Sequence, residues 1–162
     1  MGLTGCEDKQ PKQIHWQLQL EADEDPHGAG VDQGDVPDWA ARRTGVATLV
    51  WLEKATARVK TMEVDTGQQA EMEGFQVRLL GLASGLRVDT SGTFLDDENV
   101  DNPAAFVEIR RGGQLVYRGW LYVKFPELFG MDDSGWKIWL KAIRLRHAPS
   151  GADNQGTRSS AG

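Results

Sequence analysis

The sequence is poor in the residues that most enzymes use for covalent or metal chemistry. It has one cysteine, Cys6, and three histidines, His15, His27 and His147. A single cysteine excludes an internal disulfide and any site that needs several cysteines. The histidines lie in the tails or at the edge of the expected domain, so no Cys–His or Ser–His pair falls within the candidate strands. There is also no phosphate-cradling glycine loop before a helix. We therefore expect a protein that is not an enzyme and carries no cofactor.

The chain also lacks long apolar runs and a basic surplus. No run approaches the roughly 20 apolar residues that a membrane-spanning helix needs. The net charge is −6, which argues against a nucleic acid partner. Residues 7–44 hold nine acidic and four basic residues, whereas residues 45–148 hold 14 acidic and 13 basic ones. The negative charge is thus mostly a property of the N-terminal segment.

What is present at the N-terminus is the phrase Leu3-Thr4-Gly5-Cys6, which matches the end of a bacterial lipoprotein signal. The charged and apolar parts of such a signal should precede it, and only two residues do, so the signal is either trimmed or coincidental. We expect Cys6 to be lipidated; a free thiol on a polar tail is the alternative. One acyl chain binds membranes marginally, at about 0.8 kcal/mol per buried CH₂, so a diacyl or triacyl cysteine is needed. Cys6 then predicts a bacterial membrane anchor outside the cytoplasm, facing the periplasm.

Composition divides the chain into three parts. Residues 1–44 are expected to be an acidic flexible linker, because most of them cannot bury enough apolar surface to offset the entropy of ordering. Within it, Ile14–Leu20 alternates like a strand and residues 37–43 predict one helical turn that begins at a proline. Either could dock on the domain. Residues 45–148 form the expected domain, and residues 149–162 form a Gly/Ser/Asn-rich disordered tail.

The sequence of the domain consists of short runs of residues that favour β-strands, separated by residues that favour turns. The expected strands cover residues 46–53, 57–64, 75–82, 104–110, 115–125 and 136–145. Paired glycines at 112 and 113 predict a tight hairpin. Residues 83–102 form a long connection, either a loop or a hidden short hairpin. Six or seven strands in about 100 residues predict one all-β domain, an antiparallel sandwich or barrel-like fold.

Two phrases, Asn102–Ile109 and Gly119–Pro126, resemble the bacterial envelope family labelled domain of unknown function 2155. The strand pair around Leu52–Val59 is similar to that family as well, and the resemblance covers roughly residues 46–145. Membership implies a secreted or lipid-anchored protein and supplies no reaction. Many members carry core cysteines and a His-Pro-Tyr phrase before the last strand. Here that stretch reads Met131–Trp136, so properties that depend on those residues do not carry over.

One acidic segment, residues 97–108, closely resembles the sequence pattern of a calcium-binding loop. Oxygen ligands stand at positions 1, 3, 5 and 12 of the pattern, as a hard cation prefers, at Asp97, Asn99, Asp101 and Glu108. Such a loop lies between two helices, whereas the alternation of residues 104–110 predicts a strand. We therefore favour a solvated acidic loop, with calcium as the alternative and no metal as the expectation.

A candidate ligand-binding face lies on the expected strand 115–125, where cations alternate with aromatic rings. Its residues are Arg118, Trp120, Tyr122 and Lys124. Rings beside cations are suited to glycan, peptidoglycan or an anionic partner. The alternative is packing, in which the rings cover a second core or a docked linker and the cationic stems lie over them.

These observations together predict an envelope lipoprotein: a non-catalytic β-domain that binds or scaffolds an envelope protein or cell-wall polymer. A calcium-dependent or glycan-binding module is the alternative, and a carboxylate-based cell-wall hydrolase ranks below it.

Overall fold

The computed structural model describes Gly2 and residues 32–146. Cys6, the Ile14–Leu20 run and the tail 149–162 lie outside the described residues. In the described part, no helix is long and apolar enough to cross a membrane.

The described part consists almost entirely of strands, which confirms the all-β prediction. In chain order the elements are α1 (Asp38–Ala41), β1 (Thr44–Glu53), β2 (Arg58–Asp65), β3 (Gln69–Met72), β4 (Phe75–Ala83), β5 (Leu86–Val88), β6 (Phe94–Asp96), β7 (Ala104–Arg111), β8 (Gln114–Tyr122), β9 (Met131–Asp132) and β10 (Trp136–Arg146).

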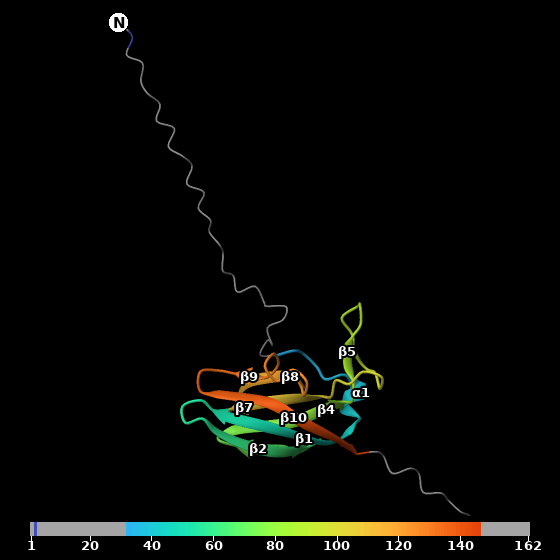
Figure 1. The fold of residues 1–162 in the computed structure, drawn as a ribbon, viewed down its shortest axis with the longest axis horizontal. Helices are drawn as coiled ribbons and strands as arrows, with labels where there is room; N and C mark the ends of the chain where they lie inside the picture. Colours follow the sequence, from blue (N-terminus) through green and yellow to red (C-terminus); the bar gives the residue numbers. More distant parts are fainter. Residues whose placement is uncertain (1, 3–31, 147–162) are drawn as a thin grey trace, which may run out of the picture.

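Two four-stranded antiparallel sheets, ordered β2-β1-β10-β9 and β3-β4-β7-β8, face each other. The main core lies between them and draws on both, for example Trp51 and Leu49 from β1 against Phe75 from β4 and Val107 from β7. The fold is therefore the sandwich form of the prediction (Figure 1). A third, two-stranded sheet pairs β5 with β6, and this hairpin projects from the sandwich beside α1.

The expected strands are all present, with ends shifted by a few residues. The largest difference is at β8, which ends at Tyr122 rather than at residue 125, because its partner strand β7 begins at Ala104, the residue opposite Tyr122. The connection 83–102 contains the hidden hairpin, β5–β6. Two short strands, β3 and β9, were not expected, since polar four- and two-residue segments give little period-two signal.

The outer face of the β3-β4-β7-β8 sheet carries a second apolar cluster. Register places Gly81 of β4, Phe106 of β7 and Trp120 of β8 in one row across three strands. Phe106 and Trp120 are buried there with Ala40, and Trp39 and Phe94 pack against them. Because both faces of this sheet are covered, strand β7 is buried from Ala104 to Ile109 with almost no alternation.

The cover of this outer face is residues 32–43, which we call the strap. Its first residues run along the edge of β8, where Gln33 N donates to Arg118 O at 2.8 Å. Its helix α1 lies over β4, and Ala40 is fully buried. The sequence places these residues in the linker, but here they pack on the domain. The folded part therefore includes residues 32–43, which lie before the expected domain boundary at residue 45.

Two glycines make room for the strap. A Cβ atom on Gly119 would lie 2.3 Å from Cδ of Gln33, whose Oε1 accepts a 3.0 Å hydrogen bond from the Trp120 N–H. A Cβ atom on Gly81 would lie 2.7 Å from Cγ2 of Val36 and 3.0 Å from Cβ of Ala40. The strap therefore fits only because these two strand positions carry no side chain.

We expect Gly81→Ala to loosen the strap and destabilise the protein by about 1–3 kcal/mol, the usual cost of overpacking a filled interior. Urea unfolding followed by tryptophan fluorescence measures this, because a loosened strap also exposes Trp120. Gly135→Ala is the matched control, since its added Cβ would meet nothing closer than 3.7 Å. Equal stability of the Gly81 and Gly135 variants would contradict a tightly docked strap.

Candidate functional site

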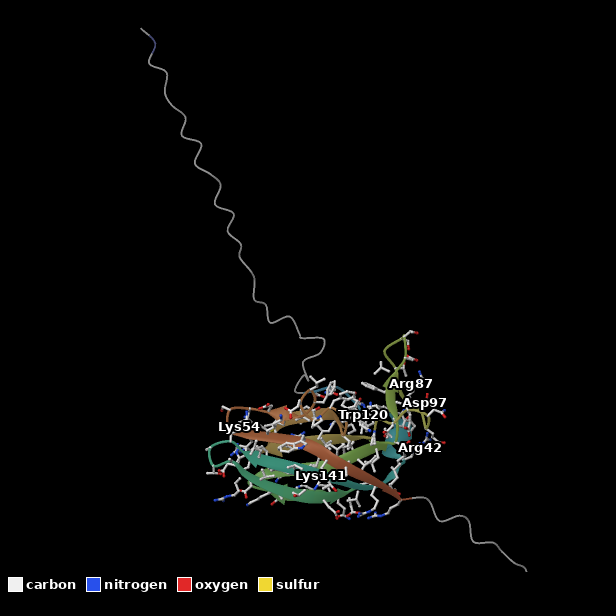
Figure 2. All side chains as sticks on the ribbon, viewed as in Figure 1. Arg42, Lys54, Arg87, Asp97, Trp120 and Lys141 are labelled. Atoms are coloured by element: carbon white, nitrogen blue, oxygen red, sulfur yellow. The ribbon has the colours of Figure 1, made fainter. Side chains whose placement is uncertain are left out.

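The strap, the β5–β6 hairpin and the loop that follows β6 line an open cleft of about 570 Å³, which we call the strap–hairpin cleft. It is lined by Trp39, Arg43, Arg87, Leu95, Asp96, Asp97, Glu98 and Asn99. Figure 2 shows Arg87 and Asp97 at the end of the sandwich from which the hairpin projects, whereas Lys54 lies at the opposite end. The volume is in the range of small-molecule sites, about 300–1,000 Å³.

Trp39 of α1 is held in a fixed orientation at this cleft. Its ring stacks on Trp120, with centroids 5.9 Å apart and planes 17° from parallel. Its indole N–H donates to the carbonyl oxygen of Phe94 at 3.2 Å, which ties α1 to β6. A ring that is stacked and hydrogen-bonded on the protein side gives the cleft a rigid aromatic wall.

Arg43 at the end of the strap is anchored by the carboxylate of Asp96. Its Nη2 atom lies 2.5 Å from Oδ2 of Asp96, whose side chain is only 6 % exposed. Oδ1 of Asp96 accepts from Ser84 N and Oγ, both at 3.1 Å, and from Gly85 N at 2.8 Å. Asp96 therefore joins the strap to the turn between β4 and β5.

Arg87 and Asp97 form a second, more open ion pair on the other side of the cleft. Arg87 Nε lies 3.1 Å from Oδ2 of Asp97. Oδ1 of Asp97 accepts from Asn99 N at 3.0 Å and from Asn99 Nδ2 at 3.2 Å. The bonds from Asn99, and then the charge of Arg87, hold the pKa of Asp97 below its usual value. Asp97 is therefore ionised at neutral pH and acts as an acceptor.

The candidate ligand-binding face on β8 is occupied by the protein itself. Trp120 is completely buried under the strap, and Tyr122 is half-buried against Phe129, with ring centroids 4.3 Å apart. Arg118 bonds to Glu108 and to the strap, whereas Lys124 lies beyond the end of β8 and pairs with Asp101 at 2.5 Å. The four residues therefore do not form an open face. The two aromatic rings are packed against other parts of the domain, which was the alternative interpretation of this strand.

The four candidate calcium ligands are also separated. Asp97 pairs with Arg87, Asp101 pairs with Lys124, and Glu108 lies within strand β7. The one hydrogen-bonded pair among these four residues is Asn99 and Asp97. Within residues 32–146, no group of three or more His, Cys, Asp and Glu side chains is placed to hold a metal ion.

Glu108 is instead the centre of a charge network that secures the strap. It is 5 % exposed, and its two oxygens accept from Arg110 Nε at 2.9 Å and from Arg118 Nη1 at 2.7 Å. Arg118 also donates to Gly34 O at 2.9 Å and to Asp35 Oδ1 at 3.3 Å. Glu108 thus fixes the guanidinium that binds the start of the strap.

Sequence reasoning missed the cleft because its residues come from segments of weak pattern. Trp39 and Arg43 belong to the expected linker, and Arg87 and Asp97 to the long connection 83–102. The available signals were the helical turn at 37–43 and the possibility of a hairpin. Neither signal indicates that the two segments meet.

Comparison with known proteins gives a family. A family model described as "Uncharacterized protein conserved in bacteria (DUF2155)" matches residues 47–142, more than half of the 162-residue chain. The chain belongs to this family. The match confirms the resemblance that the Asn102–Ile109 and Gly119–Pro126 phrases indicated. No curated protein and no solved structure matches.

The structure explains the most specific phrase of this DUF2155 chain, Gly119-Trp120. Gly119 leaves the space that the Gln33 side chain fills, and Trp120 is the ring on which Trp39 stacks. The phrase thus serves the docking of the strap rather than direct contact with a ligand.

The network predicts a pH dependence of stability. The hydrogen bond from Arg110, with the charges of Arg110, Arg118 and Arg78, lowers the pKa of Glu108, although burial opposes this. A lowered pKa means that the contribution is fully present above the unfolded-state pKa, about 4.3, and is lost as pH falls through the folded-state value. We expect Glu108→Gln to lose roughly 2–3 kcal/mol at pH 7, as for hydrogen bonds to charged groups.

Chemical denaturation at a series of pH values tests this. The difference between wild type and Glu108→Gln should shrink as the pH falls below about 4. Glu71→Gln on β3, where the carboxylate is exposed, controls for the loss of one charge and should have little effect. A difference that stays constant down to acid pH would show that the charge of Glu108 is not what stabilises the strap.

Proposed function

We propose that this protein is a lipid-anchored, non-catalytic binding module of the bacterial envelope. Cys6 carries the anchor outside the cytoplasm, and the strap–hairpin cleft receives an envelope ligand. The observation that carries the proposal is the cleft itself, in which an aromatic wall and several polar groups are held in place before any ligand binds. Preorganisation of this kind lowers the entropy cost of binding.

The state of the carboxylates favours binding over catalysis. A carboxylate-based hydrolase that works near neutral pH needs a general acid, a carboxyl group whose raised pKa keeps it protonated close to the working pH. In the cleft, the pKa of Asp97 is lowered, and Asp96 is held by Arg43 and three hydrogen bonds. Asp96 and Asp97 therefore anchor the two arginines, and Asp97 is not suited to be the general acid of the carboxylate-based hydrolase that the sequence left open.

The anchor is supported by the Leu3-Thr4-Gly5-Cys6 motif, which matches the end of a bacterial lipoprotein signal. A membrane-tethered binding module requires a stable fold, an anchor and a binding site. The described part of the chain supplies the fold and a candidate binding site, the strap–hairpin cleft.

The anchor is tested by expressing the full-length precursor in its bacterial host and partitioning the membranes with detergent. We expect wild type to enter the detergent phase and to carry acyl chains by mass spectrometry. Cys6→Ser should move it to the soluble fraction, because stable attachment needs the acyl chains. An unacylated, soluble wild-type protein would refute the anchor.

The cleft is tested in the same cells with a photo-crosslinking amino acid at position 98, where Glu98 lines the cleft and is exposed. We expect an adduct there and none at position 71, the matched exposed glutamate on β3. Arg87→Gln should abolish the adduct, since Arg87 lines the cleft, and Arg42→Gln should leave it, since Arg42 does not. Equal labelling at both positions, or labelling that ignores Arg87→Gln, would remove the cleft from the proposed function.

A further inference from the structure

We infer that the ligand of the strap–hairpin cleft is a neutral, hydroxyl-rich sugar of an envelope glycan. This inference rests on the proposed function and names the ligand class of the same site. Three features of the cleft lead to it: the aromatic wall, the arrangement of donors and acceptors, and the balance of charge.

The aromatic wall suits the face of a sugar ring. Trp39 lines the cleft while its ring rests on Trp120, so the platform has a fixed orientation. Sugar rings carry apolar C–H groups on a face, and a rigid indole ring offers a large flat surface to such groups at little entropic cost. Leu95, also on the lining, adds apolar surface beside the ring.

The polar groups around this platform include both donors and acceptors. Arg87 uses Nε toward Asp97, which leaves its other N–H donors for a ligand, and its side chain is 48 % exposed. Asp97 Oδ2 and the Glu98 carboxylate are acceptors, and the Asn99 amide adds both kinds of group. A hydroxyl both donates and accepts, so neighbouring hydroxyls on a ring match adjacent donors and acceptors.

The charges of the cleft disfavour strongly charged ligands. Its two arginines are each paired with an aspartate, at 2.5 Å for Arg43 and 3.1 Å for Arg87. The remaining charge on the lining is the carboxylate of Glu98. A phosphate or polyanion would have to displace an aspartate from its arginine and approach Glu98, whereas a cation would have to approach two guanidinium groups. A neutral ligand meets neither cost.

The probe is tri-N-acetylchitotriose, a neutral oligosaccharide of β-linked N-acetylhexosamine, titrated into the ¹⁵N-labelled full chain and followed by NMR. We expect saturable shifts, with a Kd of about 10 mM or below, at the Trp39 indole N–H and at the amides of residues 97–99. The other five indole signals should stay within noise. Arg87→Gln and Asn99→Ala should weaken binding at least about tenfold, one lost polar contact being worth roughly that factor.

Arg42→Gln is the matched control, because Arg42 is an exposed arginine at the same end of the molecule that does not line the cleft. It should bind as wild type does. All three variants keep Trp39 and the rest of the strap in place, so an unchanged thermal unfolding temperature verifies that each one is folded.

Absent or non-saturable shifts, tighter binding of oligogalacturonate than of the neutral trimer, or equal weakening by Arg42→Gln would each overturn the sugar inference. The crosslinking experiment at position 98 then tests separately whether the cleft binds any envelope ligand. An Arg87-dependent adduct to an envelope protein, without sugar binding, would leave the proposed function standing and reject only this ligand class.

Discussion

The burial of Trp120 is the constraint on which the rest of the structure depends. Three aromatic rings from three different segments meet this side chain: Phe106 at 5.3 Å, Phe94 at 5.9 Å and Trp39 at 5.9 Å between ring centroids. An indole on the outer face of a sheet exposes a large apolar area unless other elements cover it. The strap and the hairpin provide that cover, and the space between them becomes the cleft. The side chain of Trp120 therefore contributes both to the stability of the domain and to the formation of the candidate site.

Charge plays a narrower role than the number of ion pairs suggests. Exposed pairs such as Lys124–Asp101 and Arg144–Glu63 contribute little, because water screens them and long side chains lose entropy. Glu108 differs because it is buried and because both of its oxygens are engaged by guanidinium groups. Replacing such a pair by apolar residues can be neutral, whereas removing one partner leaves a buried charge. Its specific contribution here is to place Arg118, which receives the strap.

The sandwich could be predicted from the sequence because its strands obey local rules. Alternation, turn residues and the Gly112-Gly113 hairpin depend on neighbours in the chain, and the strands are observed close to their expected ends. The outer face could not be predicted in the same way. Alternation indicates that Trp120 and Tyr122 share a face, but it does not say what covers them. One signal was available: Ala104–Val107 is apolar at every position, which is typical of a strand buried on both sides. The cleft depends on contacts between α1 and β6, such as that of Trp39 with Phe94, 55 residues apart, and no local pattern encodes them.

The origin of the strap has an evolutionary consequence. The family match begins at residue 47, so Trp39 and Arg43 come from the part of the chain that precedes it, whereas Arg87 and Asp97 fall inside it. One wall of the cleft thus belongs to the shared domain, and the other is supplied by an adjoining segment. A related protein with a different segment before its first strand could keep the same sandwich and present a different cleft. In this architecture, the shape and lining of the cleft can change by exchange of a dozen residues while the hydrophobic core between the sheets stays unchanged.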